Sequence, residues 1–248
     1  SYYQKDSPLS RGYNSHLPSV TDFPLYGAMQ QAFTEKEGWS EGMARLYYVL
    51  AQDFLFSDPY RNLIFLDNHD LNRYYNTIRK DKEALKRALA FMLTTRGIPQ
   101  IYYGTELLMD GEEHKGHGEI RRDFPGGWAG DPVNAFTREG RTPEQNEVFD
   151  YMQKILQWRK NSKAVANGRL THFIPENGIY VYFRTADEES VMVIVNNSKE
   201  ERMLETERFR EALAGYQQAH EVITSKTIDV NGRIKVGAES AMILELKK

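Results

Sequence analysis

Apolar runs that are followed at once by polar residues form the clearest pattern along the chain. The run at 62–66, with the letters NLIFL, is followed by Asp67, Asn68, His69 and Asp70. Such a run is typical of a buried parallel strand that presents side chains to a ligand at its C-terminal end. The pattern therefore predicts a strand that leads into a functional site.

A second strand of this kind follows one helix later. Residues 81–96 place Asp81 as an N-cap ahead of an apolar helical face, and residues 98–103 then form an apolar strand that ends near Glu106. A strand, a helix and a strand at this spacing form a βαβ unit, so the two strands should be parallel. We therefore expect Asp70 and Glu106 to face one cleft.

In the rest of the first part, turn residues and helix-capping residues indicate where the secondary-structure elements begin and end. We expect a short strand at 17–26 that carries Asp22 and Phe23, a helix at 44–56, and a functional loop at 107–141, which is too long for an ordinary connector. A helix at 142–161 should start with a capping box.

Beyond this helix the apolar period becomes that of strands. Short runs separated by turn residues predict an antiparallel β domain, with strands at 172–173, 178–184, 191–196, 220–223, 233–236 and 241–246. We place the boundary near Lys163, which gives one part at 1–162 and a second at 163–248. The first part then holds three βα units, whereas a closed (β/α)8 barrel needs eight.

Composition narrows the class of protein. The 248 residues are 40% hydrophobic and 27% charged, with a net charge of −3, which is typical of a globular protein with an ample core. No basic stripe suggests nucleic acid as a partner, and the nearly balanced charge argues against electrostatic membrane binding. No apolar run approaches the roughly 20 residues that membrane insertion requires. Cysteine is absent, which rules out disulfides and thiolate chemistry.

Three blocks, FLDNHD, TTRGIPQIYYGTE and IRRDFPGGWAGD, resemble in order and spacing the later blocks of the α-amylase family of glycoside hydrolases. SHLPSVTDFPLYGA, LAQDF and NAFTREGRT look like neopullulanase or cyclomaltodextrinase-type enzymes of starch-utilisation systems. The resemblance implies an α/β plus all-β fold, namely the C-terminal part of a (β/α)8 TIM barrel, with its last three βα units, followed by an antiparallel β-sandwich.

The resemblance also implies roles for individual residues. Asp70 would be the family's third catalytic carboxylate, which holds the sugar hydroxyls and distorts the ring, while Asn68 and His69 would bind the same sugar. Arg73 would contact either the substrate or a neighbouring carboxylate. The family's nucleophilic Asp and general-acid Glu belong to upstream strands, so we expect the intact enzyme to cleave α-glucans and this chain alone to be inactive.

For several residues the sequence allows two alternative roles. Asp67 could serve the site or cap a turn, and the resemblance favours a structural role for Glu106. Tyr103 and Trp128 could stack on glucose, although packing is the alternative for the tyrosine. The histidines of EEHKGHGE are better explained by a solvated loop than by a metal site, and no calcium-loop motif occurs, so calcium stays open for the intact enzyme.

Three functions remain open at this point. The first is a retaining hydrolase acting on maltooligosaccharides, pullulan or cyclodextrins; the second is a transglycosylase or isomerase on the same barrel; the third is a non-catalytic sugar-binding or assembly module. We expect self-association through the incomplete barrel, because its edge and inner face lack partners. The N-terminal residues have neither an initiator Met nor an apolar signal core, which suggests a fragment or a mature form. A periplasmic or cell-envelope location rests on the resemblance alone.

Overall fold

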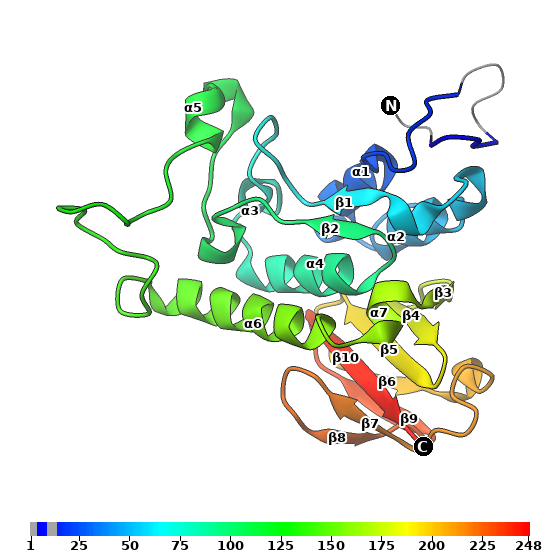
Figure 1. The fold of residues 1–248 in the computed structure, drawn as a ribbon. Coiled ribbons are helices and arrows are strands. Elements are labelled where there is room, and N and C mark those ends of the chain that lie inside the picture. Colours follow the sequence, from blue (N-terminus) through cyan, green and yellow to red (C-terminus); the bar gives the residue numbers. More distant parts are fainter. Residues whose placement is uncertain (1–3, 9–13) are drawn as a thin grey trace.

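The computed structural model describes residues 4–8 and 14–248. Residues 1–3 and 9–13 of the expected first part therefore lie outside the described residues. Figure 1 shows the helices of the first part lying above a β-sheet that is formed by the C-terminal third of the chain. The expected order, an α/β part followed by an all-β part, is confirmed.

The predicted βαβ unit is present. Strands β1 (Leu63–Phe65) and β2 (Ile98–Gln100) are parallel, with Leu63 opposite Ile98, and helix α4 (Lys82–Thr94) connects them. Asp81 caps α4, since its carboxylate accepts hydrogen bonds from the amides of the first turn. The second strand is shorter than the expected 98–103, because Gly104 takes a left-handed conformation and starts a 3-10 turn, η3 (Thr105–Leu107).

The expected strand at 17–26 was wrong for most of its length. Only Thr21 forms a bridge, parallel to Leu63, and helix α1 (Phe23–Ala32) begins directly afterwards. The carboxylate of Asp22 accepts a hydrogen bond from the Leu25 amide, and Pro24 stands in the first turn. A proline in a first turn costs no hydrogen bond, so Pro24 is compatible with a helix start.

The remaining helices surround this unit. Helix α2 (Met43–Leu50) is shorter than the expected 44–56 and continues into the 3-10 turns η1 (Asp53–Leu55) and η2 (Pro59–Arg61). Helix α6 (Pro143–Arg159) has the predicted capping box between Thr142 and Gln145. The short elements of the first part are α3 (Tyr74–Thr77), η4 (Glu113–Lys115) and α5 (His117–Ile120), and the short helix α7 (Lys163–Asn167) opens the second part.

The C-terminal part is antiparallel, as expected. A six-stranded sheet has the order β3-β4-β5-β10-β7-β8, and a pair β6-β9 faces it. The strands are β3 (Arg169–His172), β4 (Ile179–Ala186), β5 (Glu189–Asn196), β6 (Arg202–Glu205), β7 (Gln218–Glu221), β8 (Thr227–Asp229), β9 (Arg233–Val236) and β10 (Ser240–Lys247), with the turn η5 (Glu207–Phe209) between β6 and β7. The sequence missed β6 and β8, because both are short and half exposed and therefore carry almost no apolar signal.

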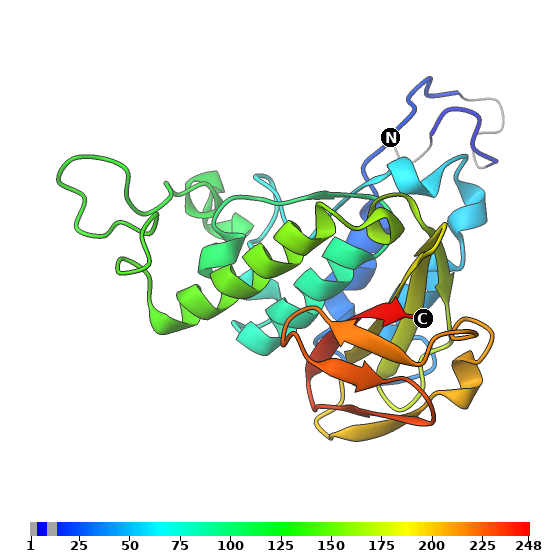
Figure 2. The ribbon, with the colours of Figure 1, turned by 60° about the horizontal axis from the view of Figure 1, so that its bottom comes forward.

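The two faces of the large sheet belong to two cores. On β4, Tyr180 and Tyr182 pack with the helices of the first part, whereas Val181 and Phe183 pack toward β9 and η5. Period-two alternation places neighbouring residues on opposite faces, which explains this division. Figure 2 shows α4 and α6 side by side next to the sheet. The two parts therefore share a continuous hydrophobic core, and a division between residues 162 and 163 stays a prediction.

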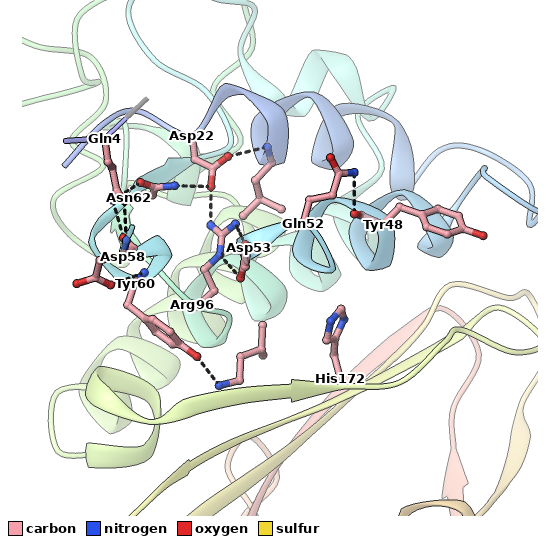
Figure 3. Close-up of polar contacts among 12 residues, drawn as sticks. Gln4, Asp22, Tyr48, Gln52, Asp53, Asp58, Tyr60, Asn62, Arg96 and His172 are labelled. Carbon is pink, nitrogen blue, oxygen red and sulfur yellow. Dashed lines mark hydrogen bonds and ion pairs between the residues drawn. The ribbon is translucent and has the colours of Figure 1, made fainter. Parts of the chain in front are cut away.

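A buried polar network joins the segments that precede the parallel strands (Figure 3). Arg96, directly ahead of β2, donates to Asp22 at 2.5 Å and to both oxygens of Asp53. Asn62, directly ahead of β1, donates to Asp22 and accepts from Gln4. The network fixes the N-terminal ends of the strands and thereby positions their C-terminal ends, where the polar residues lie.

Candidate functional site

Asp70 lies in the turn that follows β1, and its side chain is 57% exposed. The turn is held locally, because the Asn68 side chain accepts a hydrogen bond from the Asp70 amide at 2.8 Å. One carboxylate oxygen of Asp70 lies 3.2 Å from Nε2 of His69, and the other accepts from Arg121 at 2.6 Å. The predicted residues Asn68, His69 and Asp70 thus form one cluster at the C-terminal end of the strand.

Arg121 is a member of this cluster that the sequence reasoning missed. Its Nε donates to the His69 carbonyl at 2.8 Å, and its Nη2 lies 2.8 Å from Nδ1 of His117. His117 is itself 3.8 Å from Asp70. A signal was present, since Arg121 belongs to the block IRRDFPGGW, but the sequence alone gave no reason to bring that loop back to the turn after β1. The structure therefore uses the 107–141 segment to orient the Asp70 carboxylate.

Asp67 does not face solvent, and capping is the alternative that the structure supports. Its carboxylate is buried and accepts hydrogen bonds from the Tyr74 amide at 2.8 Å and from the Thr105 hydroxyl at 3.1 Å. Burial raises the pKa of Asp67 to about 6. The residue connects the turn after β1 to the start of α3 and to η3, which is a structural role.

Arg73 is placed differently from a residue that binds substrate. The side chain is buried, with its guanidinium 3.9 Å from the ring centre of Tyr102 and 4.8 Å from that of Tyr103. It donates to the Tyr103 carbonyl, while Nε and Nη2 have no partner. Its charge lowers the pKa values of Asp67 and Glu106 against the larger effect of burial. The contacts of Arg73 in the described residues are to Tyr102 and Tyr103, and a part in substrate binding stays a prediction.

Glu106 lies partly buried, with Oε2 shielded and without a hydrogen-bond partner. Burial raises the pKa of its carboxyl group. The expectation that Asp70 and Glu106 face one cleft stays a prediction.

The two aromatic candidates lie in different settings. Tyr103 is 38% exposed, and its hydroxyl donates to the Arg122 carbonyl, so one face of the ring is accessible while the other end is fixed. Trp128 is 80% exposed, and its amide donates to Asp131. Figures 1 and 2 both show the segment between α5 and α6 extending away from the rest of the molecule. Sugar stacking by Trp128 and Tyr103 stays a prediction.

A metal site requires a group of ligating side chains, and a membrane-spanning segment requires a long apolar helix. Within residues 4–8 and 14–248, no group of three or more His, Asp or Glu side chains is arranged to hold a metal ion. His114 and His117 lie in or next to short turns of the exposed loop, and His117 contacts Arg121. Over the same residues, no helix is both long and apolar enough to cross a bilayer.

Parallel strands with polar residues at their C-terminal ends, helices packed outside them, and a β-sandwich beyond define the C-terminal part of a barrel enzyme. The family profile "Alpha amylase, catalytic domain" matches residues 5–133, just over half of the chain. The profile "Cyclo-malto-dextrinase C-terminal domain" matches residues 170–245. The chain belongs to the α-amylase family.

Individual relatives agree with this assignment. The chain is 29% identical over 194 residues to a beta/alpha-amylase of Paenibacillus polymyxa, which covers 75% of this chain and 14% of that protein. It is 29% identical over 181 residues to a cyclomaltodextrin glucanotransferase of Thermoanaerobacterium thermosulfurigenes, which covers 73% of this chain and 22% of that protein. The chain therefore spans less than a quarter of the length of these two relatives.

Solved structures share the fold. An α-amylase from Geobacillus thermoleovorans, solved with acarbose, superimposes with a TM-score of 0.76 at 24% identity, over 97% of this chain and 50% of that one. A cyclomaltodextrinase superimposes with a TM-score of 0.72 at 18% identity, over 93% of this chain and 37% of that one. The expected combination of a partial (β/α)8 barrel and a β-sandwich is confirmed.

Proposed function

We propose that this chain is part of a retaining α-glucan hydrolase and that Asp70 is the third catalytic carboxylate of its site. The observation that carries the proposal is the cluster of Asn68, His69 and Asp70 at the end of β1, in a chain of the α-amylase family. A carboxylate that is oriented by Arg121 and still half exposed can accept hydrogen bonds from two adjacent sugar hydroxyls. The substrate class is starch-derived oligosaccharides, pullulan or cyclodextrins.

The remaining catalytic groups would come from other strands of the barrel. Retaining hydrolysis needs a nucleophilic carboxylate and an acid about 5 Å apart across the scissile bond. The buried Asp67 caps a turn, and Oε2 of Glu106 is shielded, so neither carboxylate is presented with Asp70 in this way. We therefore expect the 248-residue chain alone to be inactive.

Reducing-sugar release from pullulan and maltoheptaose tests this proposal. The 248-residue chain is assayed beside a version that is extended upstream through further barrel strands. Activity in the extended protein but not in the short chain supports the inference that the nucleophile and the acid lie on upstream strands. Turnover by the short chain would mean that the acid and the nucleophile are among Asp67, Asp70 and Glu106.

Arg121 provides a second test of the same site. Arg121→Ala removes the group that donates to Asp70 and to the His69 carbonyl. In the extended enzyme we expect kcat/KM to fall by about tenfold or more, which corresponds to one charge-assisted hydrogen bond. Arg138 lies in the same loop as Arg121 and forms an exposed ion pair with Asp150 of α6; Arg138→Ala is the control and should leave kcat/KM unchanged.

Transglycosylation is the second candidate, and the names of the relatives favour it. Several of them are cyclomaltodextrin glucanotransferases, which match 73–79% of this chain. Product analysis of the extended enzyme on maltoheptaose separates the candidates, because a hydrolase yields only shorter sugars, whereas a transferase also yields longer or cyclic ones. The proposal also includes a neopullulanase-like substrate preference, which a comparison of activity on different α-glucans tests. It further includes a periplasmic or cell-envelope location, which cell fractionation tests.

A further inference from the structure

A cavity of about 620 Å³ lies at the junction of the helical part and the β part, remote from Asp70. Its wall includes the segment between α1 and α2, the turn between α3 and α4, the turn between β5 and β6, and the segment between β9 and β10. This volume falls within the range of small-molecule sites in proteins. The residues that matter for its chemistry are Lys36, Arg79, Arg87, Asn197, Lys199 and Glu239.

Arg87 of α4 is the inner group of this cavity, and only 2% of its surface is exposed. Its Nε donates to the Asn197 side chain at 3.0 Å, and its Nη1 donates to the Glu239 carbonyl at 2.8 Å. Within residues 4–8 and 14–248, no carboxylate lies within 4.0 Å of the guanidinium, and Nη2 has no hydrogen-bond partner. Burial lowers the pKa of Arg87 because it removes hydration, and the more distant carboxylates of Asp81, Glu239 and Glu83 offset only part of this effect.

Two other buried arginines, Arg96 and Arg184, are satisfied in ways that Arg87 is not. Arg96 is paired with two carboxylates. Arg184 donates from Nε, Nη1 and Nη2 to backbone carbonyls of residues 94, 95 and 168. Arg87 differs from both, because it lines an open cavity and its Nη2 has no hydrogen-bond partner in the described part of the chain.

The rim of the cavity adds positive charge. Three exposed cations of the rim, for which the described part of the chain shows no ion pair, are Lys36, Arg79 and Lys199. One acid of the wall is already paired, since Glu35 forms an ion pair with Arg45. The wall acids that remain are Glu37, Asp81 and Glu239. Four cations thus face three acids, which leaves one excess positive charge around the cavity.

We propose that this cavity binds a phosphate-type oxyanion, either free or as the phosphate ester of a sugar. Nη2 of Arg87 would hold the anion from inside, and Arg79 and Lys199 would approach it from opposite sides of the rim. The volume exceeds that of an inorganic phosphate and leaves room for an attached sugar ring. Because Arg87 belongs to the helical part and Asn197 to the β part, bound anion strengthens the junction between them.

Isothermal titration calorimetry of the 248-residue chain tests the proposal, with sodium phosphate, glucose 6-phosphate and glucose at matched ionic strength. We expect saturable binding of phosphate and of glucose 6-phosphate, no binding of glucose, and a rise in the thermal midpoint with phosphate. Tighter binding of the sugar phosphate identifies an ester as the ligand, and equal affinity identifies the free anion.

Variants then test the contacts. Lys199→Ala changes an exposed residue and should weaken phosphate binding by about tenfold, the effect of losing one charge-assisted contact. Arg87→Gln should abolish binding. The control is Lys160→Ala, which removes an exposed cation at the end of α6 and should leave the affinity unchanged. Absence of saturable phosphate binding, or equal affinity in Lys199→Ala and Lys160→Ala, would overturn the proposal.

Discussion

Removal of the buried arginine ahead of β2 should destabilise the protein more than any exposed ion pair can. The change is Arg96→Met, which keeps much of the side-chain volume and removes the charge. The side chains of Arg96 and Asp22 are both 0% exposed, and that of Asp53 is 21% exposed. After the substitution Asp22 keeps hydrogen bonds from the Leu25 amide and from Asn62 only, so a carboxylate remains buried without a counter-charge.

The magnitude follows from this loss. Breaking a buried ion pair by removing one partner typically costs about 3–5 kcal/mol. Domains are stable by about 5–15 kcal/mol, so about a fifth or more of the free energy of unfolding would be lost. For a protein of this size about 1 kcal/mol moves the thermal midpoint by about 2–4 °C, which gives a fall of roughly 10 °C.

Urea unfolding followed by circular dichroism measures the effect. The matched control is Arg233→Met, which breaks the pair with Glu205 between β9 and β6, where the two side chains are 66% and 61% exposed. An exposed pair contributes about 0–1 kcal/mol, so the control should change the unfolding free energy by no more than that. If the two variants lose equal stability, or Arg96→Met loses less than about 1 kcal/mol, the account of the buried network is refuted.

Four further predictions concern pH, sugar binding and association. Burial raises the pKa of Asp67 to about 6 from an unfolded value near 4, so its stabilising contribution is present below about pH 4 and is lost as pH rises through 6. In urea titrations, the unfolding free energy of Asp67→Asn minus that of wild type should therefore rise by about 2–3 kcal/mol between pH 4 and pH 7. A difference that is the same at both pH values would contradict this. Burial lowers the pKa of His172, so stability should fall as pH drops below about 6.5, and His172→Gln should flatten that slope in the same experiment. In fluorescence titrations with maltoheptaose, Trp128→Ala should abolish binding, whereas Trp39→Ala, which changes a side chain that is 93% exposed, should not; equal effects would count against the stacking role. Sedimentation should show self-association that Ile98→Glu weakens, because this side chain on the edge of the parallel pair is 50% exposed, and a clean monomer at high concentration would exclude it.

The elements with strong local signals were predictable from sequence. The cap residue Asp81, the capping box of Thr142 and Gln145, and the alternation along β4 and β5 each act over a few residues, and the structure has all of them. Helix α1 was missed because residues 17–26 were interpreted as a short strand that carries Asp22 and Phe23. The cap by Asp22 that makes Pro24 compatible with a helix becomes decisive only when the strand ends at Thr21.

The candidate site was predictable only where it is local in sequence. Asn68, His69 and Asp70 are adjacent, so their clustering follows from the end of one strand. Arg121 joins Asp70 across fifty-one positions and lies in the long segment 107–141, which has no periodicity that fixes its path. The burial of Arg73 between two tyrosine rings likewise depends on tertiary packing and cannot be read from spacing.

The central claim is that Asp70 serves the chemistry while Asp67 serves the fold. The most direct test is to measure kcat/KM on maltoheptaose and the unfolding free energy for Asp70→Asn and Asp67→Asn in the enzyme extended upstream. The account predicts that Asp70→Asn lowers kcat/KM by about a hundredfold or more at unchanged stability, since Asp70 is exposed and would act on the transition state. Asp67→Asn should instead alter stability and its pH dependence, with kcat/KM within about tenfold of wild type. The reverse pattern, with activity lost at Asp67 and retained at Asp70, would contradict the account.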